Sequence, residues 1–173
     1  MIKFLLKFLV INILLLSSSL SEILKNIDIT GNKRISDQTI LVLGNINIGK
    51  NYNNDDLNSV VKQLYDTEFF EDISISFKNN ILRIDVIENP IIEDISIEGI
   101  RSKQTVEKIL EAINLKNRKS FIKDTLEKDI TLIKNILKTN GYYFVEVTPS
   151  INRNDELNSV RLVIDITEGP KAR

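Results

Sequence analysis

The sequence contains the same unit twice, and this duplication constrains the fold more than any other feature of the chain. ILKNIDITGN at 23–32 reappears as IIEDISIEGI at 91–100, and LRIDVIENP at 82–90 reappears as LVIDITEGP at 162–170. Self-similarity at a long, fixed period is typical of repeated structural modules. Pro90 ends the first copy and Ile91 begins the second, which leaves little room for a flexible linker. The sequence therefore predicts two tandem domains, residues 22–90 and residues 91–170.

Each copy has the same order of hydrophobic periodicities. Ile27 and Ile29 alternate with polar residues, as Ile95 and Ile97 do in the second copy, and this pattern predicts a strand with one buried face. A glycine follows each of these strands. Two stretches with helical spacing come next, and two more alternating stretches complete the copy. Each module is therefore predicted to be strand, helix, helix, strand, strand.

These elements predict an α+β fold in which two helices pack on one face of a three-stranded mixed sheet. Strands that alternate apolar and polar residues belong to a sheet covered on one side only, and the two amphipathic helices supply that cover. The last two strands form an antiparallel hairpin, and the first strand can pair in parallel with the last. The last strand is then central and the second strand is an edge. Pro149 fits an edge, because proline in a sheet is confined to edges or bulges.

The first residues have the three parts of a secretory signal. Lys3 and Lys7 precede an apolar run from Phe8 to Leu16, and a serine-rich stretch follows. We expect a signal peptide at residues 1–21, cleaved after Ser21, and export of the remaining chain. The alternative is an uncleaved anchor helix, but crossing a bilayer takes about 20 apolar residues and this run is shorter.

The composition argues against several classes of function. The chain has no Cys and no His, so a disulfide framework, a thiolate site and the commonest general base are missing. A formal net charge of -1 argues against nucleic acid as a partner, because its binders usually carry a basic face. Asp85 and Asp165 recur at matching positions, but both fall on the polar side of their strands. We therefore expect no enzyme activity and no catalytic, cofactor or metal site.

Several motifs together resemble a known family. TGN follows the first strand, FFEDI leads into the hairpin, NGYY occupies a similar place in the second copy, and the copies end in ENP and EGP. In this order they are similar to the first two polypeptide-transport-associated (POTRA) domains of the outer-membrane β-barrel assembly factors. In that family, further POTRA domains and a membrane barrel follow. The resemblance implies an N-terminal fragment, with residues 171–173 at the start of a third domain.

The resemblance also implies a function and partners. Such domains lie at the periplasmic face of the bacterial outer membrane, receive unfolded β-barrel proteins and pass them to a barrel for folding and insertion. Unfolded outer-membrane proteins are the implied clients, and periplasmic chaperones and lipoproteins of the assembly complex are the other implied partners. No cofactor is implied. Two alternatives remain open: the POTRA region of a two-partner-secretion or autotransporter-assembly transporter, and a division protein of the FtsQ type.

An edge strand offers unpaired backbone groups, so an extended client can add to it as a further strand with little dependence on sequence. We expect this site on the edge strand of the first copy, at Ile73, Ser74, Ile75, Ser76, Phe77 and Lys78. VEVTPS at 145–150, taken as its counterpart, contains Pro149 and Glu146 and is expected to be less open. The pairs Phe69-Phe70 and Tyr142-Tyr143 are expected to pack in the core where each hairpin begins.

Overall fold

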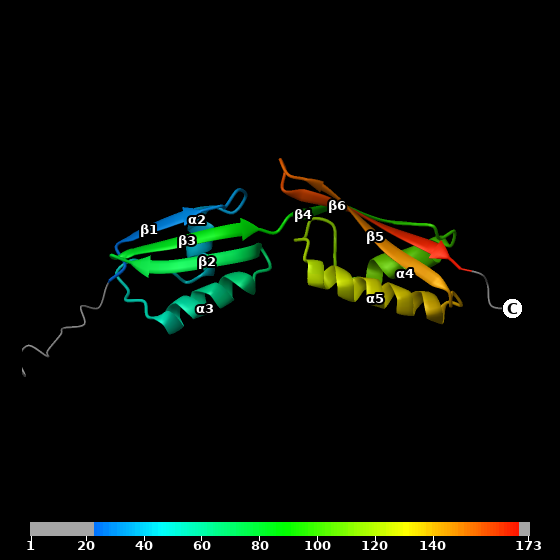
Figure 1. The fold of residues 1–173 in the computed structure, drawn as a ribbon, viewed down its shortest axis with the longest axis horizontal. Coiled ribbons are helices and arrows are strands. Elements are labelled where there is room, and N and C mark those ends of the chain that lie inside the picture. Colours follow the sequence, from blue (N-terminus) through cyan, green and yellow to red (C-terminus); the bar gives the residue numbers. More distant parts are fainter. Residues whose placement is uncertain (1–22, 170–173) are drawn as a thin grey trace, which may run out of the picture.

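The computed structural model describes residues 23–169 and shows two modules of the same build, one after the other along the long axis (Figure 1). The expected signal peptide, residues 1–21, and the expected start of a third domain, residues 171–173, lie outside the described residues. Within residues 23–169, no helix has both the length and the apolar character needed to cross a membrane.

Both modules have the predicted order of elements. The first consists of β1 (Asn26–Thr30), α2 (Asp37–Leu43), α3 (Asn54–Tyr65), β2 (Phe70–Lys78) and β3 (Ile81–Glu88). The second consists of β4 (Ile91–Glu98), α4 (Lys103–Ala112), α5 (Lys123–Thr139), β5 (Val145–Asn154) and β6 (Ser159–Glu168).

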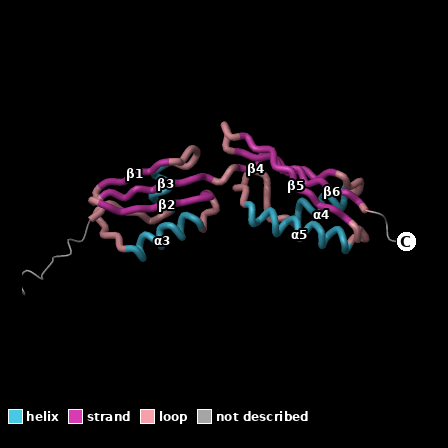
Figure 2. Tube along the Cα trace, viewed as in Figure 1, coloured by secondary structure: helices cyan, strands magenta, loops and turns pink. Residues whose placement is uncertain are grey.

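The sheets have the predicted mixed topology. Their strand orders are β1-β3-β2 and β4-β6-β5, so the last strand of each module is central and the second is an edge. The first strand of each module runs parallel to the central strand, and the hairpin partner runs antiparallel. Figure 2 shows the helices on one side of each sheet. The α+β architecture predicted from the periodicities is confirmed.

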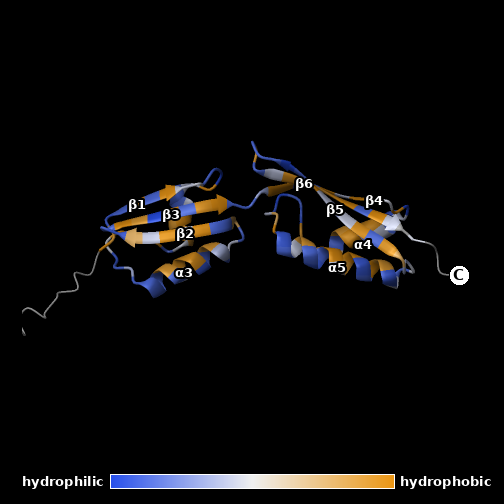
Figure 3. Cartoon of the chain, in the orientation of Figure 1, coloured by the Kyte–Doolittle hydropathy of each residue, from blue (hydrophilic) through white to orange (hydrophobic). Residues whose placement is uncertain are grey.

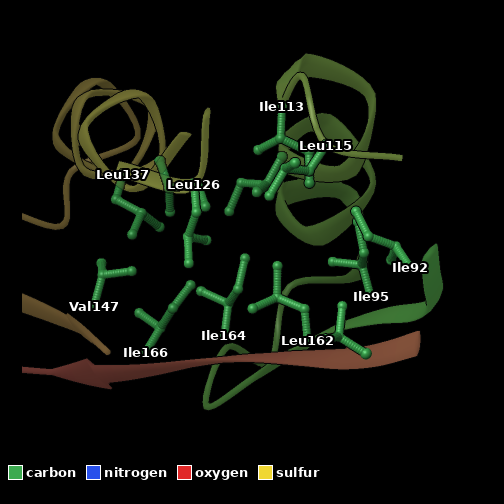
Figure 4. Close-up of a cluster of buried hydrophobic side chains, with 13 residues drawn as sticks. Ile92, Ile95, Ile113, Leu115, Leu126, Leu137, Val147, Leu162, Ile164 and Ile166 are labelled. Carbon is green, nitrogen blue, oxygen red and sulfur yellow. The ribbon is translucent and has the colours of Figure 1, made fainter. Parts of the chain in front are cut away.

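Each module has its own hydrophobic core between sheet and helices. In the second module, Leu162, Ile164 and Ile166 point from β6 toward the helices, where Leu126 and Leu137 meet them (Figure 4). The first core is built in the same way from β3 and the helices that cover it. Apolar and polar residues alternate along the strands (Figure 3). This alternation explains why each sheet buries one face and leaves the other in water.

Local signals in the sequence set where the helices begin. Ser36 and Ser102 accept hydrogen bonds from backbone N–H groups in the first turns of α2 and α4, and the predicted cap at Ser102 is confirmed. Asn53 and Asp56 form a reciprocal capping box at the start of α3. These bonds satisfy N–H groups that a helix leaves without internal partners.

The aromatic pairs at the hairpin entrances are only half buried, which corrects the expectation that both residues of each pair pack in the core. Phe70 is buried and Tyr142 packs against its core, but Phe69 and Tyr143 are exposed. Successive side chains of an extended backbone point to opposite sides, so only one member of each pair can face the core.

The junction between the modules is hydrogen-bonded on both sides. The Asn89 N–H donates to the Phe69 carbonyl oxygen of the first module at 2.9 Å. The carbonyl oxygen of the buried Pro90 accepts from the Phe121 N–H of the second module at 2.8 Å. The linker is therefore hydrogen-bonded to both modules.

A turn residue of the second module strengthens this connection. Asn158, in the turn between β5 and β6, accepts from the Ile91 N–H at 3.0 Å through its carbonyl oxygen. Its side-chain Nδ2 donates to the carbonyl oxygen of Glu88 at 3.2 Å. One residue of the second module thus holds the end of β3 and the start of β4.

A buried carboxylate ties the end of β3 to the loop between β1 and α2. The Glu88 side chain is 1% exposed, and its Oε1 accepts from the N–H groups of Lys33, Arg34 and Ile35 at 2.8, 3.0 and 2.9 Å. The Arg34 Nε lies 3.1 Å from its Oε2. Burial alone would raise the pKa of Glu88, but these N–H groups and the Arg34 charge outweigh burial and lower it.

This arrangement predicts acid sensitivity of the first module. Because the folded pKa of Glu88 lies below the ordinary 4.5, its contribution to stability is complete above that pH and is lost as the pH falls through the folded pKa. We expect the urea midpoint to decrease as the pH is lowered below about 5. Glu88→Gln should cost about 1–3 kcal/mol at neutral pH and reduce this pH dependence. Urea unfolding followed by circular dichroism measures both effects. If the urea midpoint of the variant depended on pH as strongly as that of the unsubstituted chain, the assignment to Glu88 would be contradicted.

Candidate peptide-binding edges

The six residues predicted as a client site lie on β2, which pairs with β3 alone among the described strands. Ser74, Ser76 and Lys78 are exposed, whereas Ile73 is buried, and Ile75 and Phe77 are partly buried. The expected geometry of an edge strand with a polar outer face is therefore present. Whether clients bind there stays a prediction.

The hydrogen bonds of Ile73 show which backbone groups face away from the sheet. The Ile73 N–H donates to the Tyr65 Oη at 3.1 Å and to the Asp72 Oδ1 at 2.9 Å, and so points away from β3. Backbone groups of an antiparallel strand alternate between the two sides. The outward groups farther along β2 are therefore those of Ile75 and Phe77.

Tyr65 and Asp72 close one end of this edge. The Tyr65 hydroxyl accepts from the Ile73 N–H and donates to the Asp72 Oδ1 at 3.1 Å. Burial is the largest influence that raises the pKa of Tyr65, the Asp72 carboxylate raises it further, and the Ile73 N–H opposes them. The hydroxyl therefore keeps its proton at neutral pH. Sequence reasoning missed Tyr65, because nothing in the helical pattern distinguishes it.

The edge strand of the second module corrects one expectation from the sequence. Thr148 lies opposite Asp165, as Ser74 lies opposite Asp85. Asp85 and Asp165 are equivalent, because they occupy the same place in the repeated ending. The structure therefore matches residues 73–78 of β2 to residues 147–152 of β5. The segment expected from the sequence, residues 145–150, begins two residues too early.

The two modules differ in how the chain passes from the second helix into the edge strand. This connection comprises residues 66–69 in the first module and is one residue longer, residues 140–144, in the second. In the first module, a β-bulge between Phe70 and Asp72 adds one residue to β2 and offsets this difference. Alternating patterns do not reveal such insertions, because adding residues in a connection leaves the alternation on both sides intact.

The corrected register explains the proline. Pro149 lies opposite Ile164, which is the place that Ile75 takes opposite Ile84 in the first module. The N–H of Ile75 faces outward by the alternation described above. A proline at the equivalent position therefore removes an outward donor and leaves the pairing with the central strand intact. The predicted edge position of Pro149 is confirmed.

An apolar hollow of about 420 Å³ lies beside β5. Phe121, Leu126 and Ile130 line it on the helix side, and Pro149 and Ile151 line it on the strand side. Ile151 is 44% exposed although it is apolar. A side chain of a strand added to β5 could occupy this hollow. The second edge thus lacks one backbone donor and gains an apolar surface.

No paired-carboxylate site is formed by the repeated aspartates. Asp85 lies on β3 and Asp165 on β6, in different sheets, and both side chains are exposed, as the sequence predicted. A shared cleft, which carboxylate catalysis needs, is not formed by them. Within residues 23–169, no group of three or more acidic side chains is placed to hold a metal ion.

Comparisons with known proteins agree with this architecture. The family model POTRA, described as "Surface antigen variable number repeat", matches residues 23–89 and 90–169. The chain is 27% identical over 152 residues to the outer membrane protein assembly factor BamA of Neisseria meningitidis, covering 87% of this chain and 19% of that protein. It is 28% identical over 144 residues to BamA of Neorickettsia risticii, covering 82% and 19%.

A solved structure shows the same fold. The N-terminal domain of Omp85 from the cyanobacterium Thermosynechococcus elongatus superposes with a TM-score of 0.53 at 16% identity, over 85% of this chain and 63% of that one. The chain spans about a fifth of the length of the two BamA proteins named above. The family expected from the sequence motifs is confirmed, and the chain belongs to the POTRA family, with two consecutive copies of the domain.

Proposed function

We propose that this chain is the periplasmic, client-receiving part of an outer-membrane protein assembly factor. Its relatives BamA are named outer membrane protein assembly factors, and the chain matches a small part of their length. In this proposal the signal peptide directs export, and the two modules hold unfolded β-barrel proteins before a membrane barrel folds and inserts them. Periplasmic chaperones and lipoproteins of the assembly complex are the proposed partners. The chain acts by binding and performs no bond chemistry.

The outward backbone groups of Ile75 and Phe77 carry this proposal. A client in extended conformation adds to β2 by backbone hydrogen bonds, which any sequence except proline can make. Such an interaction suits a receiver of many different chains. It is also weak, because the added strand gains contacts on one side only. Clients are therefore held briefly and released toward the barrel.

A matched pair of substitutions tests the site. Ile75→Pro gives β2 the residue that β5 carries at the equivalent position, and Pro149→Ile gives β5 the reverse change. We expect Ile75→Pro to reduce capture of an unfolded outer-membrane protein by β2 about tenfold, because it removes an outward donor. Photo-crosslinkers at Ser74 and Ser76 report capture by β2. Crosslinkers at the structurally matched Thr148 and Ser150 report capture by β5.

The controls separate binding from folding. Ser74→Pro should destabilise the first module, because that N–H faces β3, whereas Ile75→Pro should leave its circular dichroism unchanged. In the unsubstituted chain we expect stronger capture at Ser74 and Ser76 than at Thr148 and Ser150. Stronger capture at the β5 positions would place the client site at the apolar hollow of the second module. Undiminished capture by a folded Ile75→Pro variant would refute strand addition at β2.

A further inference from the structure

The junction of the two modules contains a groove on its helical side. It consists of two hollows of about 630 and 570 Å³, both lined by Glu68, Ile122, Thr125 and Lys128. The first module contributes the chain between α3 and β2, and the second contributes the start of α5 and the loop before it. Neither module forms this groove alone.

Cationic side chains dominate the groove. Those that line the two hollows are Arg34, Arg118, Lys119, Lys123, Lys128 and Arg153, against the acidic Glu68, Glu71 and Asp124. Two of the cations already have acidic partners. The Arg34 Nε lies 3.1 Å from Glu88, and the Arg153 Nε lies 3.4 Å from Asp155.

The other four cations are exposed and form no ion pair with any residue of 23–169. They are Arg118, Lys119, Lys123 and Lys128. The whole chain has a formal net charge of -1, so this excess of positive charge is local to the junction. An anionic partner would find complementary charge here.

Apolar side chains lie among these charges. The ring of Phe69 is 40% exposed and lines one hollow, and the partly buried Ile122 lines both. A single small anion would leave these apolar surfaces in water. An extended chain that carries carboxylates and apolar side chains in turn would cover both kinds of surface.

From this combination we infer that the groove binds an extended acidic segment of a partner protein. Lys119 and Lys128 meet its carboxylates, and Phe69 packs against its apolar side chains. The recognition depends on charge, unlike strand addition at β2, which depends on backbone groups. This interaction goes beyond the proposed client site and does not rest on it.

Fluorescence anisotropy with a designed peptide tests the inference. The probe is a fluorescein-labelled peptide in which glutamates are interspersed with phenylalanines and serines, and a second probe has glutamine in place of each glutamate. We expect the chain to bind the glutamate peptide, with an affinity that falls as salt is added. Lys119→Glu together with Lys128→Glu should weaken binding at least about tenfold. A milder Lys119→Gln, Lys128→Gln variant should weaken it in the same direction.

The matched control places the same change of charge elsewhere. Lys108→Glu with Lys134→Glu alters two exposed lysines outside the groove, and should leave binding nearly unchanged. The client-site variant Ile75→Pro should also bind the peptide normally. The inference would be overturned if both glutamate double variants lost binding equally, or if the glutamate and glutamine peptides bound equally well. It would also be overturned if inorganic phosphate alone displaced the peptide, or if the peptide did not bind at low salt.

Discussion

Replacing Gly31 or Gly99 by alanine is expected to unfold the module that carries it. A Cβ at Gly31 would lie 1.9 Å from the Val86 carbonyl oxygen, and one at Gly99 would lie 1.9 Å from the Ile166 carbonyl oxygen. These oxygens belong to the central strands β3 and β6, which cannot move away without breaking their backbone hydrogen bonds to the neighbouring strands. Both glycines also have φ +86, which disfavours a side chain. We expect each substitution to cost at least ~3 kcal/mol.

Two other glycines serve as controls, because they have the same backbone conformation but no close neighbour. Gly49 and Gly141 have φ +87 and +90, but a Cβ on either would meet nothing within 4 Å. Alanine at these positions should cost only about 1 kcal/mol. Urea unfolding measures the costs, and amide NMR spectra identify which module is lost. If Gly31→Ala cost no more than Gly49→Ala, the close backbone approach would not be rigid.

Asp129→Ala is expected to destabilise the second module by about 3 kcal/mol. The Asp129 carboxylate is buried on α5 and accepts from the N–H groups of Asn114 and Leu115 at 2.8 Å each. It also accepts from the Asn114 Nδ2 at 2.7 Å. Removing it leaves these donors without partners inside the protein.

Controls for Asp129 come from an isosteric change and an exposed carboxylate. Asp129→Asn keeps the shape but loses the charge and one acceptor oxygen, so its cost should be intermediate. Asp155→Ala removes an exposed carboxylate, and should change stability little. Thermal and urea unfolding give the comparison. A loss no greater for Asp129→Ala than for Asp155→Ala would show that water replaces the carboxylate at the turn.

The topology could be predicted from the sequence because both copies show the same alternation of apolar and polar residues. Ile95 and Ile97 alternate as Ile27 and Ile29 do, so the strand that opens each module is visible twice. The buried charge of Asp129 was not predicted: the residue lies three positions after Leu126, and a periodic pattern reveals neither its burial nor its partners. The loop residues that bind it are distant in sequence and meet it only after packing.

The functional surfaces were less predictable, for two physical reasons. Residue alternation does not fix which residues of the two edge strands correspond, so the match of β5 to β2 was displaced and Pro149 was not seen to replace Ile75. Contacts across the junction depend on how the modules are oriented. That orientation rests on hydrogen bonds to backbone groups, such as those of Asn158, which the pattern of apolar and polar residues does not predict.

The bonded junction also sets how far apart the two edge strands lie. Because the linker is hydrogen-bonded to both modules, we expect the separation of β2 and β5 to vary less than a flexible linker would allow. For a client long enough to reach both, the second attachment is intramolecular, at an effective concentration on the order of mM. Under the proposed function, two contacts that each dissociate quickly would together retain the client through avidity. Each contact would still open in turn, so such a client would advance along the chain without leaving it.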